Sequence, residues 1–473
     1  MDTKALRQKI LDLAIHGKLV PQDSDDEPAS VLLERIRAEK ERLIKEGKIK
    51  KPKKTKAACD KPHYPYQLPE GWVWCKLIDC CHVAGRIGFR GYTKDDLVED
   101  GAITLSPSNI VDGNMDFGKC TYISWDKYNE SPEIMVQCGD ILLVKTGSSY
   151  GKCAFVKELP KEATINPQFV VLKYIQIDAT YLTCVLQSTY ARRCYDDFVL
   201  GTAIPTFTQA VLGNMYIPLP SMAEQKRIVD SIKDWSALIG LLEFGKLKLQ
   251  DTVKQAKSKI LDLAIHGKLV LQDPNDEPAA ELLKRINSKA EIACDNPQYG
   301  KLPKGWCETT LGELFNHNTG KTLNSSNTEG TMMDYLTTSN VYWNTFDFSV
   351  VKRMLFKENE LDKCRITKGD LLVCEGGDIG RAAIWNKDYD ICIQNHIHRL
   401  RPKVKLSVPF YYYTLFYLKT NNMIGGKGIG LLGLSSNALH KIHFPLPPLV
   451  EQHRIVAKIE ELFAQLDKIE ASL

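Results

Sequence analysis

The sequence lacks several features that would place its 473 residues in a specialised class of protein. Its longest apolar runs, such as 237–242, are far shorter than the roughly 20 residues that cross a bilayer. The first residues are charged and contain no apolar signal region. The 14 cysteines include no CxxC pair, so neither a zinc site nor a disulfide framework is indicated. These absences predict a cytoplasmic protein with free thiols and no bound metal.

Net charge is also small. The 62 Lys and Arg residues exceed the 58 Asp and Glu residues by four, which does not by itself indicate a nucleic-acid partner. One dense cationic run places six lysines within nine residues, at Lys48, Lys50, Lys51, Lys53, Lys54 and Lys56. This run is equally compatible with a solvated tether and with contacts to DNA phosphates. The length exceeds what one core usually holds, so two or three domains are expected.

Two internal repeats are the most informative feature. Residues 9–20 (KILDLAIHGKLV) recur unchanged at 259–270, and over 28 residues from the same starting points 22 positions match. A second motif, IPLPSMAEQKRIV at 217–229, returns as FPLPPLVEQHRIV at 444–456. The two offsets, 250 and 227, make the ends of the chain correspond to neighbouring positions near its centre. The sequence therefore predicts a tandem repeat whose second scaffold copy is assembled from both termini.

The repeated segments carry the spacing of coiled-coil helices. Apolar residues recur at alternating steps of four and three, which predicts a long helix over 228–263 with a packed seam. Ser221 and Glu224 form a capping-box pattern at its start, and Gly17 and Gly267 suit helix ends. We expect the central helix to run antiparallel to a second helix built from the two termini. The predicted seam comprises Ile228, Ile232, Trp235, Ile239, Leu242, Leu249, Val253, Ile260, Leu263, Ile455, Ile459, Leu462, Leu466 and Ile469.

The segments between the repeats have a different character. They consist of short β-rich runs, such as 139–144, 153–156 and 170–174, with helical patterns at 181–188 and 409–418. Each segment is therefore predicted to form a mixed α/β domain. The predicted organisation is an N-terminal scaffold segment (1–60), a first domain (61–220), a central helical scaffold (221–294), a second domain (295–447) and a C-terminal scaffold helix (448–473).

Loops of both domains combine glycine with basic, amide and aromatic side chains, which are the types that contact phosphates and base edges of DNA. The predicted phosphate contacts are four cations beside glycines: Arg90, Lys145, Lys321 and Lys427. The predicted base contacts are Asn109, Tyr150, Asn340, Arg381 and Asn395, because Arg suits guanine and Asn suits adenine in bidentate geometry. Asn109 and Asn340 stand at matching points of the repeat, so caps of turns are the alternative for this pair.

Together, the LAIHGKLV–DEPA and IPLP–EQ–RIV motifs, flanking GDILLV–G–GK segments, resemble the specificity subunit of type I restriction–modification enzymes over essentially the whole chain. The resemblance implies an α/β (α+β) fold: two pseudo-twofold-related mixed α/β target recognition domains, separated by two long antiparallel coiled-coil helices. It implies a bipartite double-stranded DNA target in a system of defence against foreign DNA. It also implies that the scaffold docks two methyltransferase subunits, which bind S-adenosylmethionine, and that restriction subunits, which use ATP and Mg²⁺, then join. The docking residues expected from the second motif are Glu224, Gln225, Arg227, Glu451, Gln452 and Arg454.

Catalysis by the chain itself is not expected. Asn166-Pro167-Gln168-Phe169 is similar to the NPPF-type motif of adenine-N6 methyltransferases, but counting from the preceding glycines puts Asn395-His396-Ile397 at the corresponding place in the repeat. The segment from Gly147 to Cys153 is one residue short of a P-loop and lacks its Ser/Thr. His396 and His398 have no cysteine partners nearby and are not expected to hold a metal. A purely structural coiled-coil adaptor and a single-chain DNA methyltransferase remain the alternatives.

Overall fold

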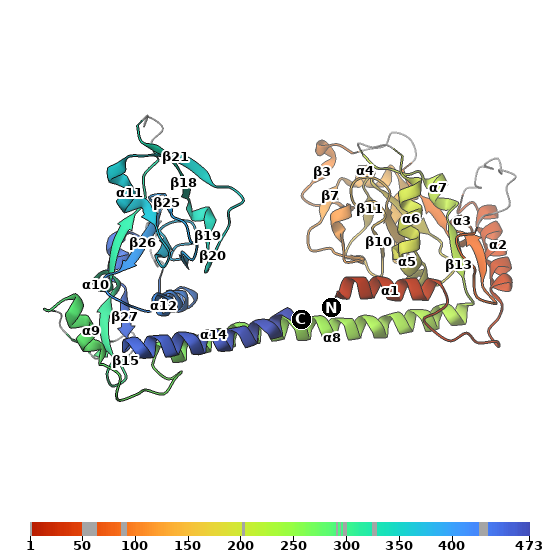
Figure 1. Cartoon of the computed structure of the whole chain (residues 1–473). Coiled ribbons are helices and arrows are strands. Elements are labelled where there is room, and N and C mark those ends of the chain that lie inside the picture. The colour runs from red at the N-terminus through yellow and green to blue at the C-terminus, as the bar shows by residue number, and fades with distance from the viewer. Residues whose placement is uncertain are drawn as a thin grey trace. The chain divides into compact units, whose positions relative to one another are not determined.

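The computed structural model describes residues 2–49, 64–86, 92–200, 204–289, 292–293, 295–296, 300–323, 329–424 and 434–473. The chain divides into two compact units, Met1–Gly245 (unit 1) and Lys246–Leu473 (unit 2) (Figure 1). The longest helix, α8 (Met222–Ile265), contributes to both units.

Unit 1 contains a two-stranded sheet, a four-stranded sheet, a five-stranded sheet and a small hairpin. The strand orders are β1 (Val73–Lys76) with β13 (Tyr216–Leu219); β10 (Cys153–Phe155), β9 (Ile141–Val144), β12 (Phe169–Lys173) and β2 (His82–Ala84); β3 (Leu97–Val98), β7 (Thr121–Ile123), β4 (Ala102–Leu105), β11 (Ala163–Ile165) and β8 (Met135–Val136); and β5 (Ile110–Val111) with β6 (Asn114–Met115). Its helices are α1 (Thr3–Ile15), α2 (Ala29–Lys45), α3 (Leu77–Cys80), α4 (Trp125–Asn129), α5 (Ala179–Gln187), α6 (Thr189–Phe198) and α7 (Gln209–Gly213).

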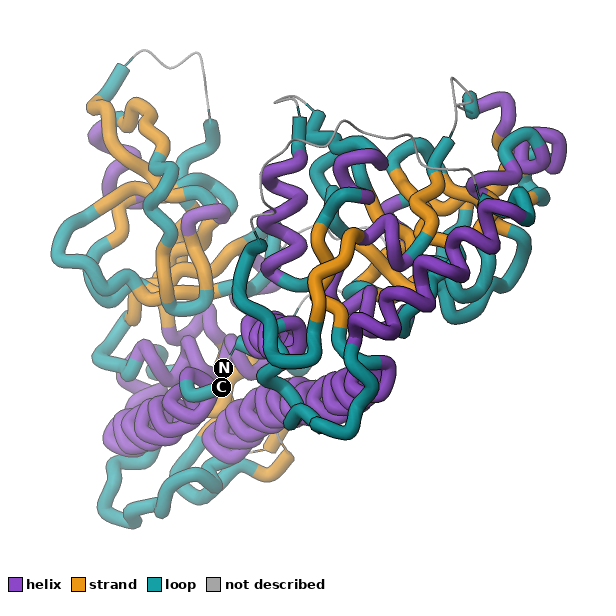
Figure 2. Tube along the Cα trace, turned by 90° about the vertical axis from the view of Figure 1, so that its right-hand side faces the viewer, coloured by secondary structure: helices purple, strands orange, loops and turns teal. Residues whose placement is uncertain are grey.

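Unit 2 repeats this plan. Its sheets are β16 (Cys307–Thr310) with β27 (His443–Leu446); β17 (Phe315–Thr319), β26 (Ile397–Pro402), β23 (Leu371–Cys374) and β24 (Ala382–Ile384); β21 (Lys352–Phe356), β18 (Thr331–Leu336), β25 (Ile391–Ile393) and β22 (Arg365–Ile366); β19 (Val341–Tyr342) with β20 (Thr345–Phe346); and β14 (Asp295–Asn296) with β15 (Gly300–Lys301). Its helices are α9 (Ala279–Ile286), α10 (Leu311–Leu314), α11 (Glu358–Cys364), α12 (Val408–Thr420), α13 (Ser436–His440) and α14 (Leu449–Ala471). In both units the strands gather in the globular part and the long helices lie outside it (Figure 2).

The four-stranded sheet forms the middle layer of each unit, because successive residues of a strand point to opposite faces. In β9, Ile141 and Leu143 enter a core shared with helices α5 and α6, whereas Leu142 and Val144 enter a core shared with the five-stranded sheet. Strand β23 alternates in the same way between two cores of unit 2. The predicted mixed α/β domains are therefore confirmed, with one layer of helices and two layers of sheet.

The terminal helices run antiparallel to α8 within their own units. In unit 1, Arg7 of α1 forms an ion pair with Glu243 at 2.9 Å, while Ala14, further along α1, shares a core with Ile228. In unit 2, Lys257 contacts Asp467 and Glu470 near the end of α14, while Leu261 shares a core with Ile459. The predicted antiparallel pairing of scaffold helices is thus observed separately for each terminus.

Candidate nucleic-acid interface

The second repeated motif joins the globular part of each unit to its scaffold helix. In unit 1 the Trp72 indole N–H donates to Glu224 Oε2 at 2.8 Å, and in unit 2 Trp306 donates to Glu451 Oε2 at 2.9 Å. Both carboxylates are buried, and burial raises the pKa of Glu224 and of Glu451. The identical contact in both units fixes the first turn of a scaffold helix against the start of a domain.

The other residues of this motif also point inward. Gln225 Oε1 accepts from Asp178 N at 2.8 Å, and its amide donates to Pro220 O at 3.0 Å. Arg227 forms a bidentate ion pair with Asp26, whose pKa is lowered chiefly by this hydrogen bond. Gln452 and Arg454 make the equivalent contacts in unit 2, to Ser407, Pro447 and Asp276.

The six residues expected to dock a partner therefore have contacts within the chain itself. Glu224, Gln225, Glu451 and Gln452 are fully buried in the chain itself, and Arg227 and Arg454 already hold a carboxylate. The repeated motif thus forms an internal joint in both units, and docking of a partner by these residues stays a prediction.

The predicted helix seam is only half covered. Along α8, Ile239 and Val253 are buried, whereas Trp235 (44% exposed), Leu242 (50%) and Leu249 (39%) are exposed. Trp235, Leu242 and Leu249 are seven residues apart, so they share one of the two apolar positions of the heptad. Four further apolar residues beside them are also exposed: Leu238, Leu241, Phe244 and Leu247. On α14, Ile455 and Ile459 are buried and Ile469 is exposed. The apolar stripe is thus wider than the terminal helices cover within each unit, and its second half faces solvent.

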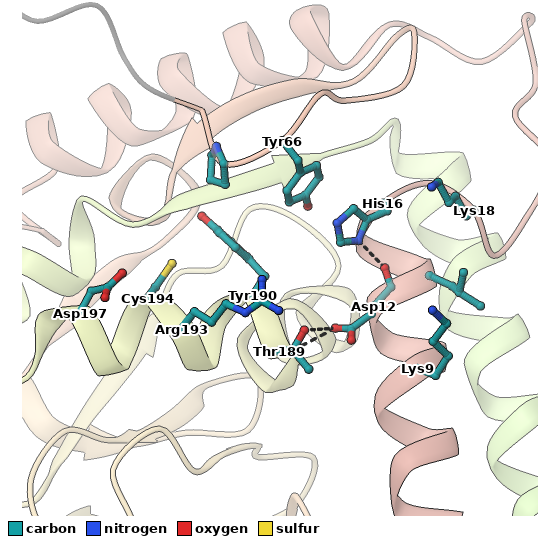
Figure 3. A pocket seen from close by; sticks show the side chains of 12 residues that line it. Lys9, Asp12, His16, Lys18, Tyr66, Thr189, Tyr190, Arg193, Cys194 and Asp197 are labelled. Atoms are coloured by element: carbon teal, nitrogen blue, oxygen red, sulfur yellow. Dashed lines mark hydrogen bonds between the residues drawn. The ribbon is translucent and has the colours of Figure 1, made fainter.

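A cavity of about 600 Å³ in unit 1 is lined by the first repeated motif (Figure 3). The His16 ring stacks on Tyr66 with centroids 4.1 Å apart, and His16 Nδ1 donates to Asp12 O. Asp12 Oδ1 accepts from Thr189 N at 3.1 Å and from its hydroxyl at 2.8 Å. The lining also contains the cations of Lys9, Lys18 and Arg193 and the carboxylate of Asp197. The cavity is therefore polar and open, with one aromatic wall.

Two predicted base contacts are caps of turns. Asn109 is buried; its Oδ1 accepts from Ser106 N and Oγ, and its Nδ2 donates to the carbonyl oxygens of Asp116 and Lys119. Asn340 makes the equivalent four contacts, to Thr337, Asp347 and Val350. Every hydrogen-bonding position of both amides is occupied, so the structural alternative describes this pair.

One predicted phosphate contact is also engaged internally. Lys321 Nζ donates to Glu360 Oε2 at 2.6 Å and to Leu355 O at 2.9 Å, and only 10% of its side chain is exposed. Contact with a phosphate would require breaking this ion pair. Lys145, directly after β9, is partly exposed. Arg90 and Lys427 lie outside the described residues, as do the lysines of the dense run beyond Lys48.

The remaining predicted base contacts are partly exposed. The Tyr150 hydroxyl donates to Asp196 at 2.7 Å, and the Arg192 guanidinium lies 4.3 Å from its ring centroid. Arg381 stacks on Tyr342 at 4.8 Å and donates to Thr338 O. Asn395 follows β25, and its backbone N–H donates to Lys321 O. These three side chains lie beside loops at the ends of the central sheets.

Comparison with known proteins now identifies the architecture. The sequence model of the type I restriction modification DNA specificity domain matches residues 47–249 and 303–473. The chain belongs to this family. Its two units are two copies of a DNA specificity domain, each joined to part of a helical scaffold.

Similar proteins cover nearly the whole chain. The specificity subunit of the type I restriction enzyme EcoAI from Escherichia coli is 27% identical, over 98% of this chain and 90% of the relative. The EcoEI specificity subunit, also from Escherichia coli, is 24% identical over 99% of this chain and 90% of that relative. The crystal structure of the HsdS subunit from Thermoanaerobacter tengcongensis has the same fold, with a TM-score of 0.53, 19% identity, and coverage of 86% of this chain and 93% of that one. A second structure, from work on complex assembly and conformational transition of the type I R-M system, has a TM-score of 0.57 and 21% sequence identity. That match covers 86% of this chain and 94% of the other chain. The two Escherichia coli relatives are named specificity subunits, which agrees with the expectation that the chain is not itself the enzyme.

The strand pairings of the two specificity domains correct one alignment that was based on sequence. Phe169 pairs with Val144 in unit 1, and Ile397 pairs with Cys374 in unit 2. Asn166 therefore corresponds to Gln394, not to Asn395 as counting from the glycines predicts. The same backbone contact confirms this, because Asn166 N donates to Leu105 O and Gln394 N donates to Leu336 O. Pro167 then matches Asn395, and the NPQF sequence has no counterpart in the second domain.

This register also places two further pairs of residues at equivalent positions of the two domains. Lys145 matches Glu375, and Gln168 matches His396, at one end of each central sheet. The runs GDILLV (139–144) and GDLLVC (369–374) end directly before Lys145 and Glu375, so the sequence signals the first match. The match of Gln168 with His396 comes from the strand register. Within the described part of the chain, no helix could cross a membrane and no cluster of three or more possible ligands could hold a metal ion.

Proposed function

We propose that this chain is the DNA-recognition subunit of a type I restriction–modification complex and reads a bipartite target, one half in each specificity domain. The observation that carries the proposal is that both units have the same arrangement of layers and the same joints to the scaffold, but different side chains at equivalent loop positions. A repeated frame supplies the same mode of DNA approach twice. Different side chains let the two halves of the target differ in sequence.

The test is a modification map. The chain is co-expressed with the methyltransferase subunit of its own system in a host without adenine methylation, and N6-methyladenine is located across the genome. A bipartite motif is expected, and replacing residues 303–447 with the same segment of a relative should change only one of its halves. A motif without two parts, or one unaffected by the exchange, would contradict the proposal. Absence of any sequence-selective binding would favour the structural adaptor.

The partner surface we propose is the exposed half of the α8 stripe. Trp235, Leu242 and Leu249 recur at heptad spacing, which suits an apolar stripe of a partner helix. Docking would remove this apolar surface from water, worth about 25 cal/mol per Å². Leu242→Glu should abolish binding of the methyltransferase subunit measured by light scattering after size exclusion. Leu271→Glu is the matched control, because Leu271 is also exposed but lies in the loop after α8. Equal loss with both variants would contradict this surface.

The first repeated motif supports the binding of two methyltransferase subunits, one to each scaffold copy. Lys18 and Lys268 are both exposed, and no hydrogen bond or ion pair of either ammonium group is seen within the described ranges. Internal packing therefore does not explain why both copies keep this lysine, whereas a partner that binds once to each scaffold copy does. Lys18→Glu and Lys268→Glu should each remove one methyltransferase subunit from the complex in native mass spectrometry. Loss of neither, or of both together, would contradict the pairing.

The remaining parts of the proposal follow from the family. S-adenosylmethionine would bind to the methyltransferase subunits, and ATP with Mg²⁺ to restriction subunits that join them. The assembled complex would act on double-stranded DNA in the cytoplasm. Purified chain alone should neither transfer methyl groups nor cleave DNA, and either activity in the isolated chain would instead support a single-chain enzyme.

A further inference from the structure

One position of the two specificity domains has an identical backbone setting and opposite charge. In unit 1, Lys145 N donates to Gln168 O at 2.7 Å and Lys145 O accepts from Phe207 N at 3.1 Å. In unit 2, Glu375 N donates to His396 O at 2.9 Å and Glu375 O accepts from Leu434 N at 2.9 Å. The same two backbone contacts thus hold a lysine in one domain and a glutamate in the other.

Both positions are accessible, and in each the neighbouring side chain is polar. Lys145, Gln168 and Glu375 are partly exposed, and His396 is exposed. Gln168 is held by the Asn166 amide, which donates to its Oε1 at 3.0 Å, and its own amide points at Thr146 O, 3.5 Å away. His396 Nδ1 lies 3.4 Å from Glu375 Oε2. Each domain therefore presents one charged and one polar side chain from adjacent strand ends.

The reversal of charge decides what this position can contact on DNA. Every phosphate is negative, so a position that contacts the backbone in a repeated frame should keep a cation or a neutral donor in both copies. A carboxylate there would be repelled. Base edges differ in their donors and acceptors, and among them the amino groups of cytosine and adenine favour an acceptor. Side chains of opposite charge at the same position of the two domains are therefore expected where that position contacts bases.

We propose that Lys145 with Gln168, and Glu375 with His396, are specificity-determining pairs at the same place in the two domains. Lys145, predicted above as a phosphate contact, becomes a base contact with a preference for guanine, whose O6 and N7 accept from lysine. Glu375 accepts from the N4 amino group of cytosine. This inference rests on the proposed function and adds to it the residues that make the two halves of the target different.

The test exchanges the pairs. Glu375→Lys with His396→Gln places the pair of unit 1 in unit 2, and the modified genome is mapped with the methyltransferase subunit present. Preference at one or two base positions of a single half-site should change by roughly 5- to 150-fold, corresponding to about 1–3 kcal/mol for a good base contact. The other half-site and the spacer should stay unchanged. Glu375→Gln, which keeps the shape of the side chain, should relax preference at one position and serves if the double variant does not fold.

The control is Asp388→Asn, which removes an exposed carboxylate of the same unit that pairs with Lys368; its motif should equal that of the unsubstituted chain. An unchanged motif in the exchanged variant would overturn the inference. So would tighter binding to all sequences with a steeper salt dependence, which identifies a phosphate contact. Absence of any bipartite motif for the unsubstituted chain would instead overturn the proposed function itself.

Discussion

The indole N–H of Trp72 donates a hydrogen bond to the buried carboxylate of Glu224, 2.8 Å away, and so ties unit 1 to its scaffold helix. Trp72→Phe removes this donor from a buried acceptor. The variant should lose about 1–3 kcal/mol of unfolding free energy, measured by urea denaturation. Adding Glu224→Met should recover part of the loss, because both members of the polar pair are then gone. Equal stability of Trp72→Phe and the unsubstituted chain would contradict a structural role for this contact.

The end of α1 offers a second test with a built-in control. Gly17 has a φ of +63°, and a Cβ placed there would lie 2.4 Å from Pro69 Cγ. Gly47 has a similar φ of +74°, but a Cβ there would meet nothing within 4 Å. Gly47→Ala should therefore show only the left-handed backbone cost of about 1–2 kcal/mol, and Gly17→Ala should lose clearly more. Similar losses in thermal denaturation of both variants would mean that Pro69 moves away easily.

The heptad spacing and the repeats made much of the fold predictable from sequence. Exact repetition of 9–20 at 259–270 located the scaffold helices, and the apolar strands around Ile141 and Val170 were predicted within two residues. The sites were harder, because exposure depends on tertiary packing that one sequence does not report. Lys321 stands beside a glycine, as a phosphate contact would, but its ammonium group pairs with Glu360, 39 residues away in the chain. The equivalence of Gln168 and His396 needed the strand pairing, because counting from the preceding glycines matches Gln168 with Ile397 instead.

A histidine pair in unit 2 predicts a pH response. His398 Nε2 lies 2.8 Å from Leu434 O, which only accepts, so His398 donates there and its Nδ1 accepts from His317 Nε2 at 2.8 Å. Burial lowers the pKa of His317 to about 4, and it also lowers the pKa of His398. Both rings are then neutral when folded but become protonated near pH 6.5 when unfolded. Their contribution to stability is complete above pH 6.5 and is lost as the pH falls towards 4.

Hydrogen exchange of strands β17 and β26 measures this response locally, which separates it from His82 of unit 1, whose pKa is also lowered by burial. Protection of these strands should fall between pH 6.5 and pH 4.5. In His317→Gln, which retains a donor towards His398, the fall should be shallower. Protection that is independent of pH in the unsubstituted chain would show that the two rings open to solvent at little cost.

The length of α8 should determine the distance between the two half-sites of the target. Inserting one heptad after Lys246, together with one heptad near the end of α14, keeps the exposed residues at seven-residue spacing and adds about 10 Å of helix at 1.5 Å per residue. B-DNA rises about 3.4 Å per base pair along each strand, so the spacer of the methylation motif should lengthen by roughly three base pairs, with both half-sites unchanged. Inserting three residues at the same places is the matched control. Because each residue turns the helix by about 100°, this insertion displaces the apolar stripe and should abolish binding of the methyltransferase subunit. If the heptad variant assembles and modifies DNA with the original spacer, the scaffold helix does not set the distance between the sites that are read.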